Sequence, residues 1–224
     1  MGKILFSLCF ILSVSTFAQT VHSSLLEGYR FNKFLSEVTD GQKKIKYEDV
    51  NGIPYLTKSF ARGKISGIDH ELLIRYSPFL DSFEVRINDD VYEIPKSFTF
   101  STIRFLENGK QFILVSTGDA NDGYFEIIAS GSSKLLKKHK TEFRPERPSL
   151  NPIIPGTPPT FEVSKPVYYI QYNNIAYLVP KSIKDLPDVI AEKAEALKLF
   201  IKENRIKTVK EYDLIRIVQF LNKY

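Results

Sequence analysis

Short runs of apolar or alternating residues, each ended by a tight turn, fill the middle of this 224-residue chain and constrain its fold more than any other feature. Strands joined by such turns are typical of an antiparallel meander, which we expect to begin near Lys64. Turn-forming Asn, Asp, Gly and Ser residues separate the runs at 88–90, 108–109, 119–123 and 131–132. The predicted strands cover residues 71–76, 82–87, 91–94, 111–116, 124–129 and 134–140.

The sequence after residue 160 predicts one more strand hairpin, over 168–179, followed by two helices. The first helix would begin with Asp185 as N-cap and with Pro187 in its first turn, where a missing N–H costs nothing. The second would begin with a capping box between Thr208 and Glu211. Six apolar residues at helical spacing are expected to face inward: Ile190, Leu197, Ile201, Leu214, Val218 and Leu221.

Together these patterns predict an α+β fold, a mostly antiparallel β domain with a C-terminal two-helix hairpin packed on it. Residues 144–160 hold six of the twelve prolines. Proline fixes φ and donates no backbone hydrogen bond, so this segment is expected to be an extended linker or a strap over the surface. It would separate a strand-rich region, 19–143, from the hairpin and helices, 161–224. A short N-terminal helix is also expected from the spacing of Phe31, Phe34, Leu35 and Val38.

Two segments of the chain echo each other without gaps. Residues 83–98 align with 168–183, and each reads as a hairpin turned at Asn, with a second strand that is stopped by Pro. The echo has two open interpretations, a duplicated structural unit or the common form of a hairpin that leaves a sheet. The identical pairs are Asn88/Asn173, Tyr92/Tyr177, Pro95/Pro180, Lys96/Lys181 and Ser97/Ser182.

The first eighteen residues have the order of a secretory signal peptide: the basic Lys3, an apolar run from Ile4 to Leu12, and small residues up to Ala18. Cleavage near Ala18 would remove Cys9, the only cysteine, and leave no disulfide or thiol. The apolar run is too short to span a bilayer, and no other run approaches the roughly 20 apolar residues required. We therefore expect an exported protein of the cell envelope, periplasmic, outer-membrane-associated or extracellular, without a transmembrane helix.

The charge of the chain is moderately basic. Removal of residues 1–18 takes the formal net charge from +5 to +4, because Lys3 is the only charged residue among them. A surplus this thin permits attraction to acidic lipid or polysaccharide, but it does not predict a nucleic-acid partner.

The residues that commonly carry chemistry form no recognisable constellation. His22, His70 and His139 lack metal-ligand spacing, and residues 118–123 fit a hairpin turn better than a calcium loop. No nucleophile motif or phosphate-binding glycine motif occurs. We therefore assign no catalytic, cofactor-binding or metal-binding residue and expect a protein that is not an enzyme. Two charged features have a simple interpretation as solvated strand surface: the facing pair Glu84 and Glu93, and the lysines 134, 137, 138 and 140.

From about Tyr47 onward the chain resembles a family of exported proteins of Bacteroidota. The resemblance implies a compartment and a shared fold, and it brings no activity, cofactor or site residue. It rests on short motifs: 52–56 with Phe60 and Gly63, then 73–76, 83–85, 123–126, 134–138, the proline-rich segment, Tyr168-Tyr169, 200–204 and Asp213-Leu214.

Two functions remain open, with a hydrolase of unfamiliar residue spacing as a third and less favoured interpretation. The first is a non-enzymatic envelope protein that binds a partner protein or an envelope component. The alternative is a β domain that binds a small apolar ligand, a lipid or a glycan fragment. An internal cavity would favour the ligand-binding alternative, and a filled core with an exposed apolar patch would favour the partner. Such a cavity would be lined by several of Tyr76, Phe83, Tyr92, Phe112 and Phe125.

Overall fold

The computed structural model describes residues 50–149 and 155–223. The predicted signal peptide and the helix predicted around 31–38 lie outside these residues. Ten antiparallel strands form one sheet in the order β10-β9-β8-β7-β6-β5-β1-β2-β3-β4. The strands are β1 (Ala61–Ile65), β2 (Ile68–Ser77), β3 (Ser82–Ile87), β4 (Asp90–Glu93), β5 (Thr102–Phe105), β6 (Gln111–Val115), β7 (Gly123–Ala129), β8 (Lys134–Arg144), β9 (Thr160–Tyr172) and β10 (Ile175–Leu178).

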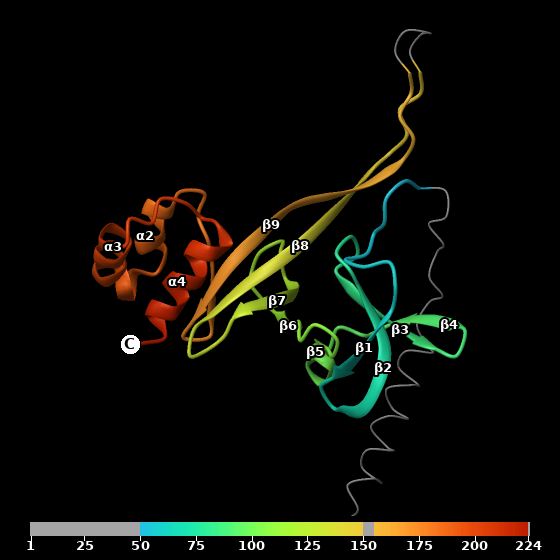
Figure 1. Cartoon of the computed structure of the whole chain (residues 1–224), viewed down its shortest axis with the longest axis horizontal. Helices are drawn as coiled ribbons and strands as arrows, with labels where there is room; N and C mark the ends of the chain where they lie inside the picture. The colour runs from blue at the N-terminus through green and yellow to red at the C-terminus, as the bar shows by residue number, and fades with distance from the viewer. Residues whose placement is uncertain (1–49, 150–154, 224) are drawn as a thin grey trace, which may run out of the picture.

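The predicted antiparallel, strand-rich architecture with C-terminal helices is confirmed. The helices follow the last hairpin and gather at one end of β8 and β9 (Figure 1). No helix among the described residues is long and apolar enough to cross a membrane. The helical segments are η1 (Phe98–Phe100), η2 (Ile183–Asp185), α2 (Leu186–Val189), η3 (Ala191–Lys193), α3 (Ala194–Glu203) and α4 (Glu211–Leu221).

The sheet curls around an aromatic core. The strands β6, β5 and β1 lie between β7 and β2, which would separate those two strands by about 19 Å in a flat sheet. The rings of Tyr76 on β2 and Tyr124 on β7 are nevertheless only 6.4 Å apart, and Phe83 on β3 lies 4.9 Å from Tyr124. Contacts this short between distant strands require that the sheet bend toward itself.

The curl is filled by the aromatic side chains expected to line an internal cavity. Tyr76, Phe83 and Phe112 are fully buried and lie ring to ring, with centroids 4.8 to 5.3 Å apart. Tyr92 packs against the same cluster, whereas Phe125 faces Tyr169 in a separate small cluster. The space in which an internal ligand would have to lie is therefore filled by these aromatic side chains.

A second core joins the helices to the sheet. All six residues predicted to face inward are buried, with exposures from 0 to 9%. They pack with Leu135 of β8 and Ile170 of β9. Burial of this apolar face provides most of the stability of helices this short.

The predicted start of the first helix is confirmed, with Asp185 as N-cap and Pro187 in the first turn, but its length and the start of the second helix need correction. Asp185 does occupy the N-cap of α2, but its side chain makes no capping hydrogen bond, and Ile190, with φ −109° and ψ 67°, ends that helix after four residues. The capping box is wrong: α4 begins at Glu211 with Lys210 as its N-cap. Thr208 bonds Asp213 instead, at 2.6 Å. The capping box does not form because the Glu211 side chain binds Lys137 of β8 and Tyr168 of β9 instead.

The two echoing segments form the two edge hairpins of the sheet, β3–β4 and β9–β10. Their registers correspond, with Ile87 opposite Asp90 in one and Tyr172 opposite Ile175 in the other. Asn88 and Asn173 both adopt positive φ, 56° and 48°, which Asn tolerates better than most residues. The two segments therefore form the same kind of hairpin, in corresponding register, at opposite edges of the sheet.

The described parts of the proline-rich segment, residues 144–149 and 155–160, lie at the far end of β8 and β9. These two strands pair with each other from Lys134 to Arg144, and a further bridge joins Arg147 to Thr157. In Figure 1 the pair extends well beyond the helices toward this tip. Strands on both sides of the segment therefore belong to the same sheet.

Candidate functional site

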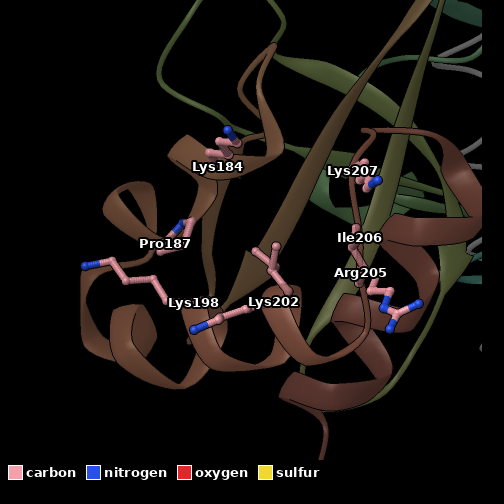
Figure 2. A pocket seen from close by; sticks show the side chains of 8 residues that line it. Lys184, Pro187, Lys198, Lys202, Arg205, Ile206 and Lys207 are labelled. Carbon is pink, nitrogen blue, oxygen red and sulfur yellow. The ribbon is translucent and has the colours of Figure 1, made fainter.

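A cavity of about 410 Å³ opens among the C-terminal helices. Its walls come from three stretches of chain: the η2–α2 turn, helix α3, and the segment after α3 (Figure 2). In this view Lys184 lies on one side of the opening, and Lys198 and Lys202 lie on the other. We call it the basic pocket; it is lined by Lys184, Pro187, Lys198, Ile201, Lys202, Arg205, Ile206 and Lys207.

Helical periodicity places the α3 residues of the basic pocket on one face. Lys198, Ile201 and Lys202 are three and four positions apart, so they project from the same side of the helix. Ile201 is buried, whereas the two lysines are exposed. The helix therefore contributes both an apolar wall and a charged rim.

The end of α3 completes the pocket through a Schellman motif, in which two backbone bonds wrap the last turn of the helix. The N–H of Ile206 donates to the carbonyl of Ile201 at 3.0 Å, and the N–H of Arg205 donates to that of Lys202 at 3.2 Å. This turn puts Arg205 at φ 51°, a left-handed conformation. Such motifs bring the residue after the turn against the last helical residues, which here are Ile206 and Ile201, the apolar floor.

The five cations of the basic pocket have little internal compensation. Lys198 pairs with Glu195 at 3.1 Å, and both side chains are more than half exposed. Within residues 50–149 and 155–223, none of the other four cations forms an ion pair. Neighbouring like charges repel one another, so an anion is the group that this arrangement accommodates best.

The second gathering of lysines surrounds Asp81, in the turn between β2 and β3. Its carboxylate accepts a hydrogen bond from the Tyr76 hydroxyl at 2.7 Å and pairs with Lys138 at 2.8 Å and Lys96 at 2.9 Å. The backbone N–H of Tyr124 approaches both carboxylate oxygens at 3.3 Å. We call Tyr76, Asp81, Lys96 and Lys138 the Asp81 cluster, which ties β2–β3 to β7 and β8 across the curl.

The Asp81 cluster corrects the prediction that the lysines of 134–140 form a solvated edge. Strand β8 lies inside the sheet, between β7 and β9, and Lys138 is only 5% exposed. Burial lowers the pKa of Lys138, against the opposing effect of Asp81. Burial, followed by the charge of Asp81, raises the pKa of Tyr76 above its usual range. A Cβ on Gly123, whose φ is 136°, would lie 1.7 Å from the Asp81 carboxylate, so glycine is required there.

Two further charged groups hold the sheet and helices together. Glu126 of β7 pairs with His139 at 2.5 Å and with Lys110 at 3.0 Å. Burial would raise the pKa of Glu126, but the bonds from His139 and Lys110 outweigh burial and hold it below its usual range. On the neighbouring helix, Glu211 binds both Lys137 and the Tyr168 hydroxyl at 2.8 Å. These contacts explain why Glu211 does not cap its own helix.

The two carboxylates of the 118–123 turn, Asp119 and Asp122, accept hydrogen bonds from other groups of the protein. Asp122 accepts bonds from the Ser116 hydroxyl and from the backbone and hydroxyl of Thr117, which lower its pKa to about 2. Asp119 accepts the Tyr169 hydroxyl at 2.5 Å, and burial and this bond raise the pKa of Tyr169 to about 12. No group of three His, Cys, Asp or Glu side chains in the described part of the chain is placed to hold a metal ion.

The remaining candidates from the sequence have mixed outcomes. His70 lies exposed on β2, and His139 is the partner of Glu126. Glu84 and Glu93 do face each other across β3 and β4 as predicted. The expectation that Glu84 is solvated is wrong, because its side chain is fully buried and pairs with Arg75 at 2.7 Å.

The basic pocket itself was missed by the sequence reasoning. The signal was present in the helical spacing of Lys198, Ile201, Lys202 and Arg205, which mixes cations into an apolar stripe. The pocket was not predicted because Ile201 was interpreted only as a core residue.

Comparison of the chain with models of protein families, with curated proteins and with solved structures finds no match.

Proposed function

We propose that this protein is an exported, non-enzymatic component of the cell envelope that binds an anionic envelope ligand in its basic pocket. The observation that carries the proposal is the set of five cations around a cavity of about 410 Å³, of which only Lys198 pairs with a carboxylate from residues 50–149 or 155–223. That volume lies within the usual range for small-ligand sites. Acidic lipids and polysaccharides are the ligands of this charge that the expected compartment offers.

The rest of the fold supports binding rather than catalysis. The half-buried Asp81 and the buried Glu84 and Glu126 are each paired with a lysine or an arginine. A general acid or base must exchange a proton with a substrate, and these groups are engaged by other side chains.

The proposal includes an α+β arrangement in which α3 and α4 pack as a hairpin on the sheet. The contacts of α4 with β7 and β8 support this arrangement.

The aromatic core gives less support to the alternative of an apolar ligand inside the sheet. Its rings lie in contact with one another, so a ligand would have to displace them. The basic pocket needs no such displacement. It is therefore the better candidate for the envelope component expected from the sequence.

The experiment compares a pocket variant with a charge-matched control. The pocket variant carries Lys184→Gln, Lys202→Gln and Lys207→Gln, and the control carries Lys58→Gln, Lys64→Gln and Lys165→Gln, three exposed lysines outside the pocket. Binding to phosphatidylglycerol vesicles and to dextran sulfate is measured for both. We expect the pocket variant to lose at least about tenfold in affinity for one of these probes, while the control stays within about threefold. Equal losses in the two variants would refute a dedicated pocket and leave only general surface charge.

A further inference from the structure

We propose that the ligand of the basic pocket is a single-chain anionic amphiphile, whose acidic headgroup is held by Arg205 and whose chain lies on Ile201 and Ile206. This inference rests on the proposed function and specifies its ligand class. Polysaccharides share the negative charge but lack the apolar chain. The floor of the pocket distinguishes the two.

The floor of the pocket is apolar although its rim is charged. Pro187, Ile201 and Ile206 are buried members of its lining, and the lysine stems around them add further methylene groups. Ile201 and Ile206 already pack in the helical core on one side, and a hydrated sugar acid would leave the parts that face the pocket without an apolar partner. An alkyl chain would cover them, while its acid group would remain among the ammonium and guanidinium groups at the rim.

Arg205 occupies a position where folding alone favours glycine. The residue that follows the end of a Schellman-capped helix adopts the left-handed conformation, which glycine reaches without the steric cost that a Cβ brings. Arg205 nevertheless stands there, at φ 51°. Its guanidinium forms no ion pair with any residue of 50–149 or 155–223. Since strained residues cluster at ligand sites, the side chain is best explained by a bound anion.

The backbone carbonyls at the end of α3 are hydrogen-bonded, which reduces the repulsion that they would exert on an anion in the pocket. A helix C-terminus carries exposed carbonyls that repel anions. Here the carbonyls of Phe200, Ile201 and Lys202 all accept backbone hydrogen bonds from residues 204–206. The fixed planar fork of Arg205 can then bind two oxygens of a phosphate or carboxylate at once.

Three probes separate headgroup from chain. Inorganic phosphate supplies the charge alone, octyl glucoside the chain alone, and octyl phosphate both. We expect saturable binding by isothermal calorimetry for octyl phosphate only. Hexyl and heptyl phosphate should bind more weakly, by up to about fourfold for each methylene removed, since each buried methylene contributes about 0.8 kcal/mol.

The decisive variant is Arg205→Gly, which removes both the guanidinium and the backbone strain. We expect the affinity for octyl phosphate to fall at least about tenfold, as for the loss of a charge-assisted hydrogen bond. The melting temperature should stay equal or rise by up to about 4 °C. Arg205→Lys keeps the charge but not the fork, so its affinity should lie between those of Arg205→Gly and the wild type. If Arg205 were kept only for folding, Arg205→Gly would lower the melting temperature and leave the affinity unchanged.

The outcomes distinguish this inference from the proposed function. If octyl phosphate binds no better than inorganic phosphate while dextran sulfate still binds at the pocket lysines, the amphiphile is refuted and the anion-binding function stands. If no anionic probe depends on those lysines, both are refuted. An unchanged affinity of Arg205→Gly for octyl phosphate would overturn the role of Arg205.

Discussion

Lysine side chains converge at two places in this protein, and their surroundings differ. In the Asp81 cluster the Lys138 side chain is 6% exposed and shares a carboxylate with Lys96 and Tyr76. In the basic pocket the cations are exposed, only Lys198 has a paired acid in the described part of the chain, and the residues between them are apolar. A buried, paired cation joins strands that are not neighbours, whereas exposed, unpaired cations repel one another and add little to folding. The first arrangement is structural, and the second is the one for which we propose a ligand.

The largest effect is expected at the Asp81 cluster. Asp81→Asn removes the negative charge while retaining a residue that tolerates φ 51°. Because Lys138 would remain buried without its counter-ion, the free energy of unfolding should fall by about 3–5 kcal/mol in urea denaturation. The matched change in the basic pocket, Lys202→Gln, should stay within about 0.5 kcal/mol of the wild type. Similar values for the two variants would end the distinction between the two sites.

A slightly smaller effect is expected in the helical core that supports the basic pocket. Leu197 is fully buried on α3, so Leu197→Ala should cost about 2–5 kcal/mol of unfolding free energy. Leu199 on the same helix is 58% exposed, and Leu199→Ala should change stability by no more than about 0.5 kcal/mol. Chemical denaturation of both variants checks this. A harmless Leu197→Ala would mean that the helices are an appendage and do not pack on the sheet.

The smallest effect concerns acid. Because the pKa of Asp122 lies near 2 in the folded protein, against 3.8 for an unperturbed aspartate, its stabilising contribution is complete above about pH 4. It is lost as the pH falls from about 4 through 2, since the unfolded chain takes up the proton first. Thermal melts should therefore show a smaller loss between pH 7 and pH 2.5 for Asp122→Asn than for the wild type. Parallel losses in the two proteins would mean that the Ser116 and Thr117 bonds do not persist in solution.

The strands were predictable because local turn chemistry set them. Asn88 and Asn173 mark hairpins by residue type alone, and the runs beside them alternate. Strands β1 and β5 were not predicted as such. They have five and four residues, and their Gly63, Lys64 and Arg104 interrupt the apolar pattern.

The curl and the site were beyond local reasoning. Asp81 meets Tyr124 across 43 positions of sequence, and no periodicity encodes that approach. The basic pocket depends on the left-handed turn at Arg205, which is a backbone conformation and not a residue pattern. Its helical spacing could have been noticed, but its depth arises only when α2, α3 and the segment after α3 come together.

The most direct test of the account is a titration of the ¹⁵N-labelled protein with octyl phosphate, followed by two-dimensional NMR. The account predicts saturable amide shifts in 184–186 and 198–207, with the Asp81 cluster unmoved. Shifts centred on Tyr76, Asp81, Lys96 and Lys138, or no saturable shift at all, would contradict it.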